Sequence, residues 1–136
     1  MDVIGIDRVM FAGRDIEAMR DRFADLLDIE FGPPVEWHTG MPLYFADHPR
    51  IEILGPAEMD DEIARYIDEH GQGLYGVAFR VADIEAALSE LADRGVEPLF
   101  EDEIENVHEA AFHPKEFAGV YVVLAEHHHP IGDPRF

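Results

Sequence analysis

The tetrapeptide DIEA occurs twice in this 136-residue chain, at residues 15–18 and again at residues 83–86. The two copies are 68 residues apart, which is half the length of the chain. Each copy follows an apolar segment typical of a β-strand and opens a run with apolar residues at helical spacing. A repeat of this length predicts a fold built from two copies of one unit.

The first half has the pattern of a strand, a helix and three further strands. Residues 4–12 favour a strand, and apolar side chains recur at helical spacing from Ile16 to Leu27. Gly32, Pro33 and Pro34 end that helical segment. Three short strands separated by Gly and Pro are expected at residues 35–38, 41–47 and 50–54.

The second half repeats this order. A strand is expected at residues 73–81, a helix from Ile84 to Gly95, and strands at 98–101, 108–113 and 120–126. A linker helix at about residues 58–70 joins the halves. We therefore expect a single α+β domain over residues 1–136, with two βαβββ modules pairing into a curved mixed sheet around a shared cup. The modules span residues 1–56 and 71–126, and residues 127–136 form a tail.

Side chains alternate between the two faces of a strand, so the sequence predicts which residues line the cup. In the first strand Val9 and Phe11 share one face, while Arg8 and Met10 share the other. Uniformly apolar faces should carry the helices. The mixed faces, which include Arg8 and Glu52, should line the cup.

The charge balance is strongly acidic, with 30 Asp and Glu against 10 Lys and Arg. Such a surface repels nucleic acids and anionic membranes, so neither is expected as a partner. No run of 18 apolar residues occurs, and neither a signal-peptide pattern nor any cysteine is present, so a cytoplasmic location is expected. Two explanations fit this composition. A salt-rich cytoplasm favours acidic surfaces with few lysines, and a GC-rich genome encodes arginine in place of lysine.

Five segments, in order, resemble the vicinal oxygen chelate superfamily, which includes glyoxalase I, extradiol dioxygenases, bleomycin-resistance proteins and methylmalonyl-CoA epimerase. The resemblance is greatest to the epimerase-like branch and covers nearly the whole chain. It implies the paired-module fold and a small-molecule ligand in the cup, and we expect a homodimer. The segments are DIEA at 15–18, RIEILGP at 50–56, GQGLYGVAFRVADIEA at 71–86, FHPK at 112–115 and GVYVVLAE at 119–126.

The resemblance also implies a divalent metal held by two His and two Glu or Gln on the first, fourth, fifth and eighth strands. Those positions fall here on Arg8, Glu52, Gly76 and Val123. Only Glu52 can act as a ligand, because arginine keeps its proton and the other two side chains carry no donor atom. We therefore expect no metal at this position and no other cofactor.

The histidines offer few alternatives. The cluster at residues 127–129 follows the last expected strand, so we expect it in a solvated tail. His113 opens the FHPK turn and is expected to be structural. His108 is either a ligand contact pointing from the seventh strand toward the cup or an ordinary surface or hydrogen-bonded histidine.

Arg8 and Glu52 are the candidate catalytic residues, because the first and fourth strands converge in such cups. Two interpretations stay open. The pair is a salt bridge filling a disused metal site, or Arg8 binds a substrate carboxylate or enolate oxygen while Glu52 serves as a base. The side chains expected to contact a ligand are those of Tyr75, Tyr121, His108, Trp37 and Tyr44.

Two functions therefore remain open from the sequence. One is an isomerase, epimerase or lyase acting on a carboxylate or acyl-CoA-type substrate without the usual divalent metal. The alternative is a non-catalytic protein that binds or sequesters a small molecule, as bleomycin-resistance proteins do. A metal-dependent dioxygenase or glyoxalase is disfavoured because three of the four expected ligands are replaced.

Overall fold

The computed structural model describes residues 1–58, 61–104 and 106–128, and its chain forms two compact units. The first unit is Arg8–Tyr75. The second unit combines Met1–Asp7 with the chain from Gly76 onward. The unit boundaries therefore cut through two strands, β1 (Val3–Ala12) and β5 (Gly73–Val81), each of which contributes residues to both units.

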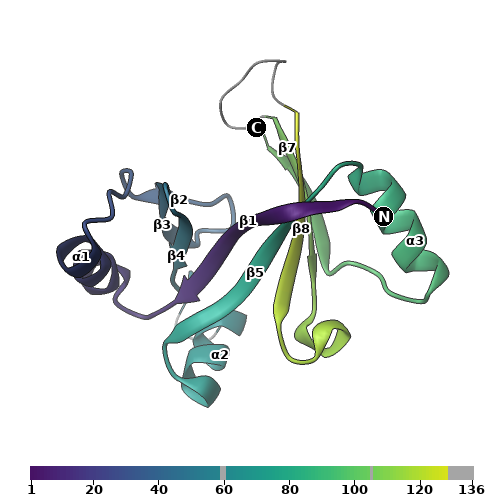
Figure 1. Cartoon of the computed structure of the whole chain (residues 1–136). Helices are drawn as coiled ribbons and strands as arrows, with labels where there is room; N and C mark the ends of the chain where they lie inside the picture. The colour runs from purple at the N-terminus through teal and green to yellow at the C-terminus, as the bar shows by residue number, and fades with distance from the viewer. Residues whose placement is uncertain (59–60, 105, 129–136) are drawn as a thin grey trace. The chain divides into compact units, whose positions relative to one another are not determined.

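The first unit holds a mixed four-stranded arrangement in the order β2-β3-β4-β1. β1 and β4 are parallel, whereas β3 is antiparallel to both β2 and β4. Figure 1 shows α1 following β1, and α2 leading into β5. The elements are β1 (Val3–Ala12), α1 (Ile16–Leu27), β2 (Val35–Glu36), β3 (Pro42–Asp47), β4 (Arg50–Leu54) and α2 (Glu62–His70).

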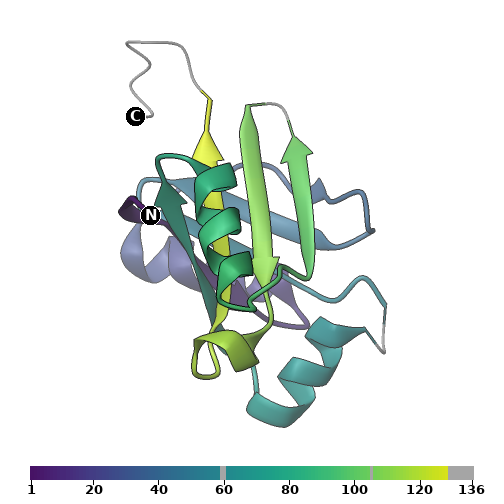
Figure 2. The ribbon, with the colours of Figure 1, turned by 90° about the vertical axis from the view of Figure 1, so that its right-hand side faces the viewer.

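In the second unit the strands follow the order β1-β5-β8-β7-β6. β5 and β8 are parallel, and β7 is antiparallel to both β8 and β6. Figure 2 shows α3 lying over this set of strands. The elements are β5 (Gly73–Val81), α3 (Ile84–Asp93), β6 (Phe100–Ile104), β7 (Val107–Phe112), a 3₁₀ turn (Pro114–Phe117) and β8 (Tyr121–His127).

The α+β fold predicted from the repeat is confirmed, because each half runs strand, helix, three strands. The expected strand at 50–54 and the expected strand at 73–81 match β4 and β5 in full. The linker helix begins at Glu62; residues 59 and 60 of the predicted helix lie outside the described residues.

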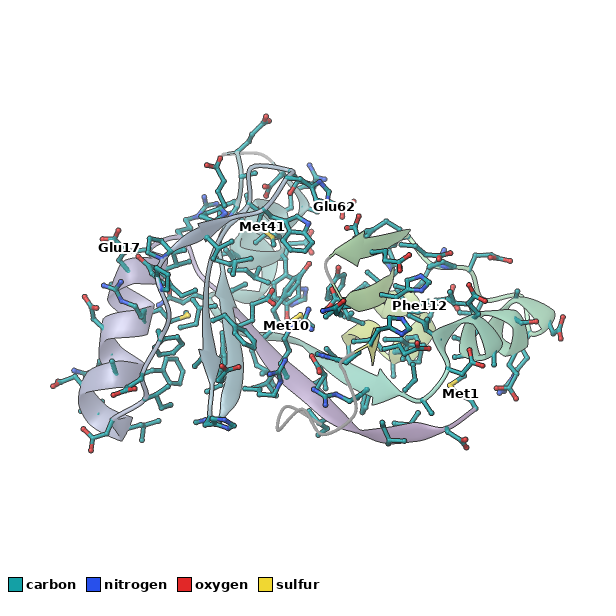
Figure 3. All side chains as sticks on the ribbon, turned by 90° about the horizontal axis from the view of Figure 1, so that it is seen from above. Met1, Met10, Glu17, Met41, Glu62 and Phe112 are labelled. Carbon is teal, nitrogen blue, oxygen red and sulfur yellow. The ribbon has the colours of Figure 1, made fainter. Side chains whose placement is uncertain are left out.

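The apolar strand faces carry the helices, as alternation predicted. In the first unit Val9 and Phe11 pack against a core that includes Ile16 of α1 and Ile53 of β4. In the second unit Phe112 is fully buried, and Figure 3 shows it on the side of the strands that faces α3. In the first unit the opposite faces of β1 and β4 carry Arg8 and Glu52.

The repeated DIEA has the same physical role in both units. Asp15 and Asp83 are the N-cap residues of α1 and α3, and each carboxylate accepts a hydrogen bond from the backbone N–H three residues later. The isoleucine that follows is buried, and the glutamate in the first turn complements the helix dipole. Figure 3 shows Glu17 pointing away from the strands.

The helices are short. α1, α2 and α3 contain 12, 9 and 10 residues. Within the part of the chain that the structure describes, none of them is long and apolar enough to cross a membrane.

Candidate functional site

A buried ion pair joins β1 and β4 in the first unit. The Nε atom of Arg8 donates a hydrogen bond to Oε2 of Glu52 over 2.8 Å. The parallel register places Glu52 opposite Met10, two residues beyond Arg8 and on the same face of the strands. The two side chains are only 10% and 12% exposed. The structure thus brings together the two residues predicted to be catalytic.

Both charges of this pair have left bulk water, so each depends on the other for compensation. The guanidinium supplies a permanent positive charge and a planar set of donors suited to a carboxylate or an oxyanion. The arrangement can therefore stabilise negative charge on a small molecule.

Tyr75 of β5 belongs to the first unit and packs edge-on against Tyr66 of α2, with ring centroids 4.8 Å apart. Burial raises the pKa of the Tyr75 phenol to about 12, with smaller contributions from the negative charges of Glu62 and Asp61. The phenol therefore stays protonated at neutral pH and can donate a hydrogen bond.

Tyr121 of β8 belongs to the second unit and lies directly opposite Gly76 of β5. A Cβ atom at position 76 would lie 2.3 Å from the carbonyl oxygen of Tyr121, closer than any real contact. Glycine is therefore required at this position, because the backbone of β8 takes up the space of a side chain.

The two remaining aromatic candidates of the first unit differ in environment. Tyr44 is buried in the core beside α1, and the guanidinium carbon of Arg20 lies 4.4 Å from its ring centroid. This location assigns Tyr44 to packing rather than to ligand contact. Trp37 follows β2, is partly exposed, and packs against the ring of His38 with centroids 5.2 Å apart.

His108 of β7 does not lie on the face predicted for it. The register places it opposite Glu126, in the same row of side chains as Ala110 and Phe112, which pack against α3. Its Nε2 atom lies 3.1 Å from Oε2 of Glu101 on β6. Of the two interpretations left open by the sequence, the structure supports the hydrogen-bonded histidine.

A second buried polar cluster lies in the second unit, and sequence reasoning missed it. Oδ1 of Asp7 accepts hydrogen bonds from Nη2 of Arg80, over 2.8 Å, and contacts Nε2 of His127 over 2.6 Å. The Asp7 side chain is fully buried, and the His127 side chain is 6% exposed. The available signal was a charged residue inside each of two apolar strands, at Asp7 and Arg80.

The expectation of a solvated tail from residue 127 is therefore wrong for His127, because β8 extends to this residue and buries its ring. His128 is half exposed and pairs with Glu126, with Nε2 and Oε2 2.8 Å apart. His129 and the rest of the predicted tail lie outside the described residues. The strand end was misplaced because a histidine has no strong preference that would reveal one more strand residue.

A family model described as the glyoxalase/bleomycin resistance protein/dioxygenase superfamily matches residues 7–126. This chain belongs to that superfamily. Among curated proteins, the uncharacterized protein YqjC of Bacillus subtilis is 26% identical over 136 residues, which cover 98% of this chain and 94% of YqjC.

Solved structures agree with the superfamily fold. Methylmalonyl-CoA epimerase from Mycobacterium tuberculosis is 24% identical, with a TM-score of 0.82 over 94% of this chain and 90% of that one. A variant of the Streptomyces coelicolor epimerase in complex with 2-nitronate-propionyl-CoA is 20% identical, with a TM-score of 0.81 over 93% and 99% of the two chains.

The residues present do not fit the divalent metal that the resemblance to this superfamily implies. Glu52 is bound to Arg8, whose guanidinium has no lone pair to donate to a metal. Gly76 leaves no room even for a Cβ atom, and Val123 offers only a buried apolar side chain. Among the described residues, no three His, Asp or Glu side chains are placed to hold a metal ion.

Proposed function

We propose that this protein is a small-molecule enzyme of isomerase, epimerase or lyase type. Its substrate is a carboxylate or an acyl-CoA thioester, and the reaction proceeds without the divalent metal usual in the superfamily. The observation that carries the proposal is the buried Arg8–Glu52 pair on the strands where metal ligands were expected. The similar fold of the methylmalonyl-CoA epimerases supports the choice of substrate class.

In this proposal Arg8 holds a carboxylate or an enolate oxygen of the substrate, and Glu52 accepts a proton from the adjacent carbon. A fixed cation next to developing negative charge lowers the barrier, since the charge need not be solvated anew. Within the first unit, Tyr75 and Trp37 are the proposed neutral contacts: a phenol that remains protonated and an indole that can stack. Tyr121 stays a predicted ligand contact of the second unit.

The second candidate is a non-catalytic binding protein of the bleomycin-resistance type. The observation in its favour is that Arg8 and Glu52 already satisfy each other over 2.8 Å, as expected of a pair that only fills a disused site. In either case we propose a cytoplasmic homodimer with neither nucleic acid nor membrane as a partner. Light scattering on the purified protein should give twice the mass of one chain.

The anion-binding role of Arg8 can be tested by ligand-induced thermal stabilisation. A panel of small carboxylates and acyl-CoA esters, including methylmalonyl-CoA, should stabilise the wild-type protein and leave Arg8→Met unaffected. Arg8→Lys should restore little, because a lysine lacks the planar fork of donors. The matched control is Arg14→Met, which removes an exposed arginine paired to Asp68 over 2.6 Å. Equal stabilisation of wild type and Arg8→Met would exclude Arg8 from the site.

Catalysis is separated from binding by isotope exchange. Wild-type protein incubated with methylmalonyl-CoA in D₂O should place deuterium on the carbon next to the thioester, as followed by mass spectrometry. Glu52→Gln should bind the thioester but exchange more slowly, by about 10²–10⁴-fold. Binding by the wild type with no exchange above the rate in buffer would favour the sequestering protein instead.

A further inference from the structure

A second arginine of the first unit lies beside the Arg8–Glu52 pair. β1 and β4 are adjacent parallel strands, and their register pairs Met10 with Glu52. Two residues earlier in each strand, Arg8 and Arg50 are neighbours whose side chains leave the same face as Glu52. The chain has only 10 Lys and Arg against 30 Asp and Glu. In so acidic a protein, two neighbouring arginines favour a negatively charged ligand at this face.

The two guanidinium groups lie on the two sides of Glu52. Arg8 reaches the carboxylate from β1, with its Nε atom 2.8 Å from Oε2. Arg50 extends toward β3 instead, where its guanidinium carbon lies 5.0 Å from the ring centroid of Phe45. Phe45 is the residue directly opposite Glu52 in the register of β3 and β4, and its ring attracts the cation. Glu52 is therefore flanked by one cation on the side of β1 and by another on the side of β3.

Arg50 also contacts Asp47, since its Nη1 atom donates a hydrogen bond to Oδ1 over 3.3 Å. This distance is longer than the 2.8 Å between Arg8 and Glu52, and the Asp47 side chain is 67% exposed, compared with 12% for Glu52. An exposed ion pair contributes little to stability, so another carboxylate can replace that of Asp47 at small cost. The Arg50 side chain is 27% exposed, so a ligand can reach it from solvent.

We propose that Arg50 is a specificity-determining residue that binds a carboxylate of the substrate. The inference rests on the proposed function, in which Glu52 accepts a proton from a carbon next to a thioester or carboxylate. When Arg50 binds the carboxylate, Arg8 is left to bind the enolate oxygen, so that each negative charge has its own guanidinium. The preferred substrate then carries a carboxylate on the carbon that Glu52 deprotonates, and a thioester with a methyl group in its place binds weakly.

The test compares two thioesters that differ only in this group. Methylmalonyl-CoA carries the carboxylate, and isobutyryl-CoA has a methyl group in its place. In isothermal titration calorimetry, the wild-type protein should bind methylmalonyl-CoA about 10–100-fold more tightly. Arg50→Met should remove this preference and leave the affinity for isobutyryl-CoA unchanged. Arg14→Met, which removes the exposed arginine paired to Asp68, should keep the preference.

Asp47→Asn provides a second measurement that covers the case in which Arg50→Met does not fold. Without the competing carboxylate, Arg50 should bind methylmalonyl-CoA more tightly, by up to about fivefold, while the affinity for isobutyryl-CoA stays the same. Asp68→Asn is the matched control, because it removes a carboxylate that is 66% exposed from the other arginine pair. It should change neither affinity. Equal affinities for methylmalonyl-CoA in Asp47→Asn and wild type would overturn the proposal.

The remaining outcomes separate this inference from the proposed function. Equal binding of the two thioesters by the wild type overturns the role of Arg50 and leaves the proposed function standing. A preference that survives in folded Arg50→Met also overturns it, because another group then binds the carboxylate. Binding of neither thioester by the wild type overturns the acyl-CoA form of the proposed function and this inference with it.

Discussion

Gly76 of β5 lies directly opposite Tyr121 of β8. A Cβ atom added at position 76 would lie only 2.3 Å from the backbone carbonyl oxygen of Tyr121. The residue at an expected metal-ligand position is therefore fixed by the backbone of the neighbouring strand. Restoring a histidine there would require β5 and β8 to separate.

The first prediction follows from this overlap. Gly76→Ala should lower the free energy of unfolding by about 1–3 kcal/mol, because the strands must shift to admit the methyl group. Gly5→Ala is the matched control on β1, where an added Cβ meets nothing within 4 Å. Urea unfolding followed by circular dichroism measures both. Equal stability of the two variants would show that β8 can move at no cost.

The Arg8–Glu52 pair predicts a strongly non-additive mutant cycle. Removing either charge alone should cost about 3–5 kcal/mol, because the remaining buried charge loses its partner at 2.8 Å. Arg8→Met combined with Glu52→Leu should recover much of that loss. The exposed Arg14–Asp68 pair, whose side chains are 46% and 66% exposed, should contribute less than about 1 kcal/mol when treated in the same way. Additive losses at Arg8 and Glu52 would contradict the pairing.

The two N-cap aspartates should contribute similarly to the free energy of unfolding. Asp15→Ala and Asp83→Ala should each cost about 1 kcal/mol, because each leaves the helix without its side-chain acceptor. Because the two caps belong to different helices in different units, the double variant should lose the sum of both. Asp15→Asn and Asp83→Asn keep an acceptor oxygen and should be nearly neutral. Thermal unfolding of the five variants and the wild type measures the effect.

The raised pKa of Tyr75 predicts that the folded protein loses stability at alkaline pH. Its pKa is raised to about 12 in the folded protein, compared with 10 for an exposed phenol. The folded state therefore holds this proton more tightly, and the associated stability is present below pH 10 and lost as the pH rises through 12. The loss approaches about 2–3 kcal/mol at the upper end of this window.

The measurement compares urea unfolding of wild type and Tyr75→Phe from pH 8 to pH 11. The phenylalanine variant has no phenol to ionise, so its stability should decline less steeply above pH 10. Parallel curves for the two proteins would assign the alkaline loss to other groups.

Much of this fold was predictable because its signals are local. DIEA is a capping residue, a buried isoleucine, a first-turn acid and a helix former, and each acts within one helical turn. Alternation in β1 likewise separated Val9 and Phe11, which pack toward α1, from Arg8, which pairs with Glu52. The pair was predictable from the resemblance, because no local pattern links residues 44 positions apart.

The features that could not be predicted from the sequence are those that depend on strand register and strand length. His108 lies on the α3 side because of its pairing with Glu126, and a shift of one residue would reverse this. Register likewise places Tyr44 opposite Ile53, where its ring is buried beside α1. The burial of His127 depends on Asp7, which is 120 positions away in the sequence. The acidic side chain of Asp7 gives no indication of which strand lies beside it.

β1 supplies Met1–Asp7 to one unit and Arg8 onward to the other. A chain cut between the two sequence repeats would therefore leave Arg80 and His127 in the carboxyl-terminal fragment and their shared carboxylate in the other. Two basic groups that are buried in the intact protein would lose the carboxylate that they share. The segment that is repeated in the sequence and the compact unit of the structure therefore have different boundaries.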